Sequence, residues 1–201
     1  MSIRIVTSIG IDETSIRKHH QYVSNIVDLA TLLFSYNYGS TKRQRPLTII
    51  GGKGIKIFMH RLYRLYPWIE PIDYDFVVKT MPKGKLIHSG LTIITSPVEH
   101  RTESIAVRLE ENGKSAVFSG DTDTAPSLID LAQDADLLVL ECTYPLQKER
   151  GHLNLVALKE IVTQARPDRV ILTHLDPQWE DYHSPLPAPL LLGEDCMEIE
   201  V

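Results

Sequence analysis

The sequence predicts an α/β fold in which sheet packs on sheet inside and helices lie outside. Predicted strands outnumber predicted helices, hairpins come early in the chain, and strand–helix–strand alternation comes late, a pattern that suits a layered arrangement. Three short apolar runs also end in a side chain suited to metal binding. The 201 residues contain no internal repeat, low-complexity tract or obvious linker. We therefore expect one domain over residues 1–201.

The first half of the chain alternates short strands with two helices. Apolar residues between positions 23 and 34 recur at helical spacing and give the first helix one apolar face. Gly39 follows it as a predicted C-terminal cap, and Pro67 ends the second helix. The expected elements are a strand at 3–7, a helix at 23–38, a strand at 47–50, a helix at 55–65, and strands at 74–79 and 85–95.

The glycine-rich turn at residues 51–54 lies between a predicted strand and a predicted helix, where phosphate-binding loops also occur. Its sequence, GGKG, has neither the GxxxxGK[ST] spacing of a P-loop nor the GxGxxG fingerprint of a dinucleotide site. We interpret it as a tight turn that uses the freedom of glycine at positive φ.

The second half contains the most apolar runs of the chain. Residues 137–140 are entirely apolar, which predicts an interior strand. Thr124 is a candidate N-cap for the helix that Pro126 opens. The expected elements are a hairpin of strands at 105–109 and 115–119, a helix at 126–133, a strand at 137–140, a helix at 154–165, a strand at 169–173 and a weak strand at 197–201.

Composition narrows the classes of function. A formal charge of −5 and a pI near 5.9 argue against a general nucleic-acid footprint, although Lys42, Arg43 and Arg45 form a local basic loop. That loop is either a small backbone-contacting patch for RNA or a solvated surface loop. No apolar run approaches the roughly 18 residues of a membrane span, and no signal-peptide pattern is present, so we expect a cytoplasmic protein without a membrane partner. Cys142 and Cys196 lack metal-site spacing and are interpreted as buried thiols.

Four side chains suited to metal chemistry follow apolar runs or lie in loops that contain glycine. They are His100, Asp121, His152 and His174. Imidazole and carboxylate groups suit zinc, manganese or iron. A metal bound by such groups lowers the pKa of its water towards about 7, and two metals that share a carboxylate can act on a phosphoester. The alternative for each histidine taken singly is a structural or surface role.

The order of four short motifs resembles that of the metallo-β-lactamase fold superfamily, in particular its ribonuclease Z-like hydrolases. The motifs are SGDT at 119–122, the stretch DLLVLECTYP at 136–145, GHL at 151–153 and LTHL at 172–175. His100, which precedes the predicted hairpin, is similar to the third-motif histidine of that family. The resemblance implies a metallo-β-lactamase-like αββα sandwich. It also implies a metal-dependent hydrolase.

The resemblance assigns a role to each candidate residue. Asp121 would bridge two metal ions, His100 would complete the first site and His174 the second. His152 would lie near the leaving group, with Glu141 as the carboxylate that orients it. Glu141 has an equally weighted alternative, a buried carboxylate made acceptable by hydrogen-bonded partners.

The chain departs from the family at its first motif. The family has HxHxDH before a helix similar to 23–38, whereas residues 17–22 read RKHHQY. Aligned without a gap, only His19 keeps a ligand type; with a gap, His19 and His20 could stand for two of the ligands. About ten residues separate Val6 from Arg17, so the N-terminal half of the sandwich is expected to be shortened. With His19 or His20, the first site reaches the three protein ligands that a tight zinc site needs, and the second site does not.

Two functions from different classes follow. The first is a metal-dependent hydrolase that uses one or two zinc ions, with manganese or iron as alternatives. Its substrate would be a phosphodiester or similar ester, either RNA or a small molecule. The second is a catalytically silent member that acts as a binding or interaction module, so whether the chain is an enzyme stays open. A third reading, an internally shortened version of an ordinary hydrolase, accounts for altered ligands beside retained ones. A shortened sandwich also exposes sheet edges, which predicts a homo-oligomer.

Overall fold

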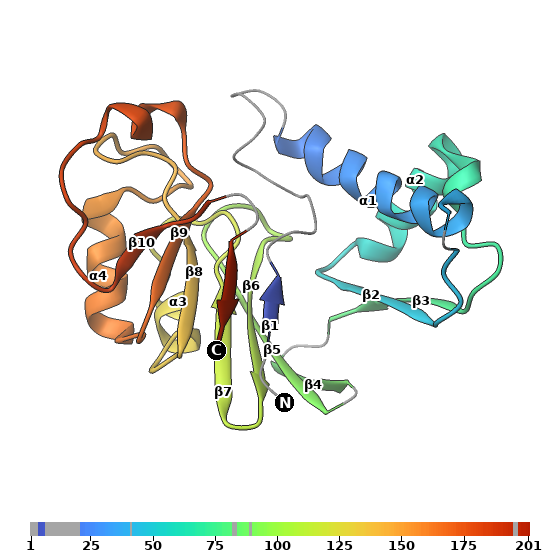
Figure 1. The fold of residues 1–201 in the computed structure, drawn as a ribbon, viewed down its shortest axis with the longest axis horizontal. Coiled ribbons are helices and arrows are strands. Elements are labelled where there is room, and N and C mark those ends of the chain that lie inside the picture. The colour runs from blue at the N-terminus through green and yellow to red at the C-terminus, as the bar shows by residue number, and fades with distance from the viewer. Residues whose placement is uncertain (1–3, 7–20, 41, 82–83, 89, 195–196) are drawn as a thin grey trace. The chain divides into compact units, whose positions relative to one another are not determined.

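The computed structural model describes residues 4–6, 21–40, 42–81, 84–88, 90–194 and 197–201, which form two compact units (Figure 1). Unit 1 comprises residues 1–18 and 82–201, and unit 2 comprises residues 19–81. The units are described separately, and a single domain over 1–201 stays a prediction.

Unit 1 is built on a seven-stranded sheet with the strand order β10-β9-β8-β7-β6-β5-β4. Strands β4 to β7 pair antiparallel, and β7 to β10 pair parallel. The strands are β4 (Gly84–His88), β5 (Leu91–Pro97), β6 (Ile105–Glu111), β7 (Lys114–Phe118), β8 (Leu137–Glu141), β9 (Val170–Thr173) and β10 (Leu190–Leu192).

Four strands of this sheet deliver their carboxyl ends to the same edge. β7, β8 and β9 are parallel neighbours, and β5 runs in the same direction because β6 is antiparallel to both β5 and β7. Loops that follow these strands therefore lie next to one another. Such a carboxyl edge is a common location for ligand sites in α/β proteins.

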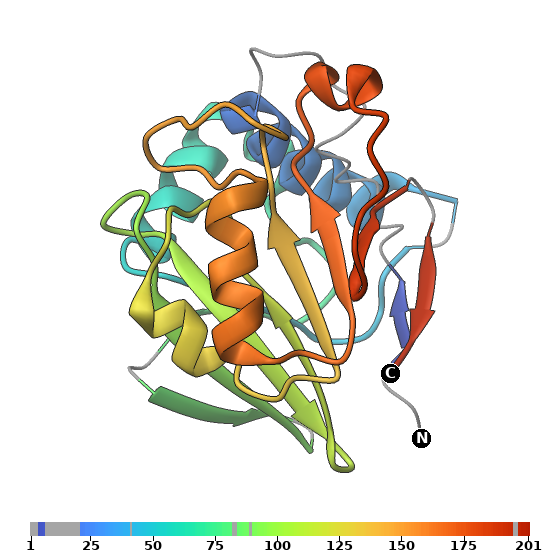
Figure 2. The same cartoon turned by 90° about the vertical axis from the view of Figure 1, so that its left-hand side faces the viewer.

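The two faces of the sheet bury different side chains because alternate residues of a strand point to opposite sides. Leu138 and Leu140 of β8 belong to the cluster that packs under helices α3 (Pro126–Leu131) and α4 (Leu155–Ala165) (Figure 2). Leu137 belongs to a second cluster with Ile199 and Val201. The latter two residues come from the two-stranded antiparallel sheet of β1 (Arg4–Val6) and β11 (Glu198–Glu200) and its end. Unit 1 thus confirms the predicted layering, with sheet against sheet on one side and helices on the other.

Unit 2 is a small α/β body of its own. Its two strands pair parallel, and its helices bury Leu33, Met59, Leu62 and Ile69. Gly54 opens the second helix with φ 96°, in the left-handed region, which agrees with the predicted tight turn. The elements are α1 (Gln21–Tyr38), β2 (Leu47–Gly51), α2 (Ile55–Leu65), the 3₁₀ turn η1 (Pro67–Ile69) and β3 (Phe76–Thr80).

Several local predictions need correction. The run expected as one strand at 85–95 is the hairpin of β4 and β5, with Gly90 at φ 88° before β5. Thr124 does not cap α3, because Ala125 is the N-cap residue and no side chain caps that helix. The proline-rich tail contains two elements that periodicity did not reveal, the 3₁₀ turn η2 (Pro177–Asp181) and strand β10. Among the described residues, no helix is both long and apolar enough to cross a membrane.

Candidate functional site

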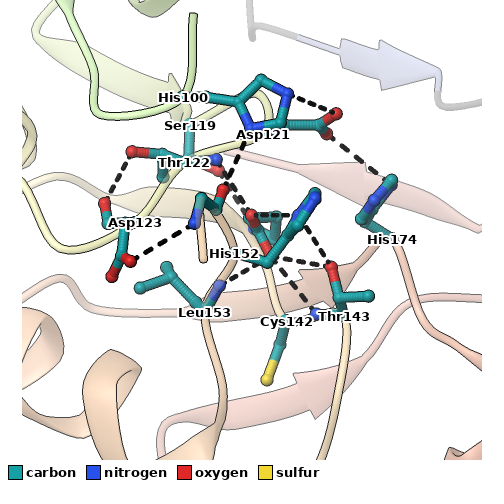
Figure 3. A network of polar contacts seen from close by, with 12 residues as sticks. His100, Ser119, Asp121, Thr122, Asp123, Cys142, Thr143, His152, Leu153 and His174 are labelled. Atoms are coloured by element: carbon teal, nitrogen blue, oxygen red, sulfur yellow. Dashed lines mark hydrogen bonds and ion pairs between the residues drawn. The ribbon is translucent and has the colours of Figure 1, made fainter. Parts of the chain in front are cut away.

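The Asp121 carboxylate lies between two imidazoles at the carboxyl edge of the sheet (Figure 3). Its Oδ2 is 3.9 Å from His100 Nε2, and its Oδ1 is 3.6 Å from His174 Nδ1. The three residues come from the loops after β5, β7 and β9. Each carboxylate oxygen therefore faces one histidine, and the three predicted ligands converge.

The backbone of Gly151 fixes the orientation of His100. The Gly151 carbonyl oxygen lies 3.1 Å from His100 Nδ1, and because a carbonyl only accepts, this nitrogen carries the proton. The unprotonated Nε2 of the neutral ring then faces Asp121, as a metal ligand requires. Gly151 has φ 84°, and a Cβ at this position would lie 3.0 Å from His100 Nδ1. Glycine is thus required here by both conformation and space.

His174 occupies an unusual backbone conformation directly after β9. Its φ is 60°, in the left-handed region that costs a non-glycine residue about 1–2 kcal/mol. Its side chain is almost fully buried and directed towards Asp121. Residues held in such conformations cluster at functional sites, where the surrounding structure compensates for the strain.

Glu141 is a buried carboxylate surrounded by hydrogen-bond donors. Its side chain is 2% exposed, at the end of β8. Charged groups in such positions require compensation by several hydrogen bonds. The donors are Thr122 N (2.9 Å), Thr143 N (3.2 Å), Thr143 Oγ1 (3.1 Å), Leu153 N (3.1 Å) and His152 Nδ1 (3.0 Å). These hydrogen bonds are what the buried-carboxylate alternative requires, and the bond to His152 is the contact that the orienting role requires, so that role stays a prediction.

His152 is held by Glu141 with its Nδ1 as donor, which leaves Nε2 for the site. The hydrogen bond to the Glu141 carboxylate raises the pKa of His152 above its usual value, against the opposing effect of burial. The His152 ring lies 5.1 Å from that of His100 and is stacked at 5.3 Å on that of His174, measured between centroids. An imidazole that carries a proton readily is thus placed beside both candidate ligands.

The donor set fits a zinc-class ion in chemistry but is incomplete in number. On each side of the Asp121 carboxylate, the described residues offer one oxygen of that carboxylate and one imidazole. No three or more of the described side chains form a group that could hold a metal ion. A zinc site usually has three protein ligands. The remaining predicted ligands, His19 and His20, lie outside the described residues.

Sequence reasoning missed two residues, Lys148 in the loop between β8 and α4 and Asp123 in the loop after β7. Lys148 Nζ donates to the Asp123 carboxylate and, at 2.7 Å, to the main-chain carbonyl of His152. Asp123 also accepts from Gly151 N at 3.4 Å, and its own N–H donates to Glu99 O at 2.8 Å. Asp123 thereby joins the loops that carry His100, Asp121 and His152. The only sequence signal was its place two residues after Asp121.

The predicted basic loop of unit 2 is largely engaged within its own unit. Lys42 Nζ lies 3.8 Å from Asp73, and the Arg43 guanidinium donates to the carbonyls of Arg45 and Pro46 at 2.8 Å each. Arg43 also lies over a tyrosine ring of α1. These contacts favour the surface-loop interpretation over a free phosphate-binding patch.

The chain is similar to a family model, to several curated proteins and to solved structures. Residues 66–175 match the model of the beta-lactamase superfamily domain. Ribonuclease BN of Proteus mirabilis is 25% identical over 230 residues, covering 87% of this chain and 73% of that protein. Probable metallo-hydrolase YhfI of Bacillus subtilis is 26% identical over 162 residues, covering 78% of this chain and 63% of that protein. The crystal structure of YhfI, described as a metallo-beta-lactamase fold protein, superposes with a TM-score of 0.68 at 22% identity and covers 92% of this chain and 75% of that one.

Proposed function

Because this chain belongs to the beta-lactamase superfamily, we propose that it is a metal-dependent hydrolase that cleaves a phosphodiester or similar ester. The observation that carries the proposal is the position of Asp121 between His100 and His174, with His152 beside both rings. A shared carboxylate with one imidazole on each side is the arrangement expected of a centre that holds one or two ions. Zinc is the proposed ion, since histidine and carboxylate donors suit it, with manganese or iron as alternatives.

In this proposal Asp121 would bind an ion together with His100 and a second ion together with His174. The further donor expected from His19 or His20 stays a prediction. An ion bound there supplies a Lewis acid and lowers the pKa of a water molecule towards about 7. Asp121 Oδ1 and Oδ2 would bind on the two sides, and the Gly151 carbonyl would keep His100 Nε2 directed inwards.

His152 is the proposed general acid. Glu141 accepts a hydrogen bond from His152 Nδ1–H and stabilises the charged ring, so that Nε2 can give its proton to the leaving oxygen. In this proposal His152 is the acid, and Glu141 is the carboxylate that positions it. A contribution of 10²- to 10⁴-fold is typical of such a group.

RNA is one proposed substrate and a small ester is the other. The ribonuclease BN relative supports RNA by its name, and YhfI carries only the general name of a metallo-hydrolase. The chain spans 73% and 63% of these two relatives, so their whole activities need not transfer.

A binding module without catalysis is the second candidate. It is favoured by the absence, among the described residues, of a group of three side chains that could hold a metal ion. The Glu141–His152 pair favours the hydrolase, because it places a readily protonated imidazole beside His100 and His174.

Metal content and turnover test the proposal together. The chain, purified without chelators, is expected to carry one or two equivalents of zinc and to hydrolyse bis(p-nitrophenyl) phosphate. Asp121→Ala is expected to abolish both, whereas Asp130→Ala, an exposed carboxylate of α3, is expected to preserve both. Absence of metal after saturation with zinc and manganese would overturn the hydrolase and leave the binding module.

A further inference from the structure

The two units carry opposite charge. Residues 19–81 contain eight Lys and Arg against four Asp and Glu, which gives +4, while the whole chain carries −5. The remainder of the chain therefore has a formal net charge of −9. A basic segment of this kind within an acidic protein indicates a partner that is negatively charged.

Helix α2 concentrates this charge on one side. Its apolar side packs into the core of unit 2 through Met59 and Leu62. Positions 56, 60 and 64 are one helical turn apart and therefore share the opposite side. We define the cationic face as the exposed residues Lys53, Lys56, His60, Arg61 and Arg64.

The lysines and arginines of the cationic face have no acidic partner within the described structure. The ion pairs there involve other residues, and the only described pair in unit 2 joins Lys42 to Asp73. Unpaired cations on a regular element are available for an external ligand. This distinguishes α2 from the basic loop at 42–45, where Arg43 is occupied.

We infer that the cationic face of α2 binds the phosphate backbone of single-stranded nucleic acid. From position 56 to position 64 the helix rises by about 12 Å, so its exposed cations are spread along a line that a strand can follow. The four permanent cations of the face are Lys53, Lys56, Arg61 and Arg64. The surface shares no residue with the candidate metal centre, and binding there does not depend on hydrolysis.

An exposed tryptophan follows the cationic face. Trp68 in η1 is 53% exposed, three residues after α2 ends. Tyr66 contacts it edge-on with ring centroids 5.6 Å apart, which holds the indole in place. Single-stranded nucleic acids combine backbone contacts to cations with base stacking on such rings. Trp68 is therefore the proposed stacking platform.

The composition of the exposed side favours nucleic acid over a membrane surface. A helix that binds in the membrane interface directs a broad apolar face outwards. The main apolar face of α2 is instead buried, and its only strongly exposed apolar residues are Ile57 and Leu65, at 61% and 63%. Both lie among the cations.

Fluorescence of Trp68 provides a direct assay. The chain has two tryptophans, and Trp179 is buried, so quenching by an added strand reports on unit 2. A mixed-sequence RNA oligonucleotide, titrated with EDTA present to prevent turnover, is expected to quench the emission. The apparent affinity should fall as salt rises. Trp68→Phe should remove the signal, while anisotropy of a labelled strand still reports binding.

Substitution of lysine and arginine residues tests whether RNA binds at the cationic face. Lys56→Ala with Arg64→Ala is expected to weaken RNA binding and to reduce the slope of log affinity against log salt by about 1.4, since each phosphate contact on a single strand contributes about 0.7. Lys85→Ala with Lys159→Ala removes two exposed charges from unit 1 and serves as the matched control. Its slope should equal that of the unaltered chain.

Three outcomes would overturn the inference. They are no RNA binding at low salt, equal loss in both double variants, and tighter binding to phosphatidylserine vesicles than to RNA. Asp121→Ala separates this inference from the proposed function, because it should lose hydrolysis and keep RNA binding. A chain that hydrolyses the small diester but binds no RNA would reject only the surface on α2.

Discussion

Lys148 and Asp123 are joined by a hydrogen-bonded ion pair that connects the loop after β8 to the loop after β7. The same Lys148 ammonium group holds the carbonyl of His152, and the same Asp123 carboxylate accepts from Gly151 N. The pair therefore connects the backbone of the proposed acid to the loop that carries Asp121. Its effect on the site is one of position, because the pair contacts the backbone of His152 and Gly151.

Lys148→Ala is expected to lower kcat on bis(p-nitrophenyl) phosphate by about 10- to 100-fold, since a small displacement of His152 is costly to a proton transfer. The melting temperature should change little, because a half-exposed ion pair contributes at most about 1 kcal/mol. Steady-state kinetics and thermal unfolding measure the two effects. Lys148→Arg should restore part of the rate, and unchanged kcat in Lys148→Ala would show that the loop needs no such link.

Substitutions of Glu141 separate its two roles. Glu141→Gln keeps an acceptor but removes the charge that stabilises protonated His152, so we expect kcat to fall by about 10²- to 10⁴-fold. Glu141→Ala also leaves four backbone and hydroxyl donors unsatisfied, and should destabilise the chain by about 3–5 kcal/mol. Urea unfolding of both variants tests the difference. Equal activity of Glu141→Gln and the unaltered chain would exclude the acid assignment.

Gly151→Ala is expected to impair metal binding more than folding. The new methyl group would meet the His100 ring, and the positive φ adds about 1–2 kcal/mol of strain. The affinity for zinc, measured by competition with a chromogenic chelator, should decrease because His100 Nε2 no longer faces Asp121. Gly113→Ala provides the control, since it has a similar φ of 78° and no atom within 4 Å of the added carbon. Equal zinc affinities in the two variants would contradict the proposed role of Gly151.

Asp136 should make stability depend on pH. The Lys114 ammonium group, followed by Ser115, holds the pKa of the Asp136 carboxyl below its usual value. A lowered folded-state pKa means that its stabilisation is complete above the unfolded value, near 3.8, and is lost as pH falls through the folded value. Asp136→Ala should cost about 1–3 kcal/mol at pH 7. The difference from the unaltered chain should shrink in urea unfolding below about pH 4, and a difference that is constant with pH would refute the assignment.

The sequence predicted the parts of the fold that depend on local pattern. The apolar run at 137–140 and the helix at 154–165 correspond to β8 and α4 because periodicity and the Asn154 cap act locally. β10 was missed because it pairs with β9 across a proline-rich stretch, and non-local pairing leaves no periodic signal. Thr124 was a reasonable cap by residue type, but the chain enters α3 through Ala125.

The candidate site shows the same division. Asp121, His100 and His174 were assigned from motif order, and their convergence follows from strand direction, which the motifs did not contain. The contact between Lys148 and Asp123 joins two loops 25 positions apart, and only packing brings them together. The role of His19 and His20 stays a prediction.

The common direction of β5, β7, β8 and β9 makes each donor of the candidate centre separately replaceable. One rigid sheet fixes where the donors stand, while each loop decides only which side chain is offered, so a change in one loop leaves the others in register. A weaker metal ligand in one loop can therefore occur while the donors in the other loops keep their positions. The same independence makes the centre an accessible scaffold for redesign, in which a missing donor is introduced one loop at a time.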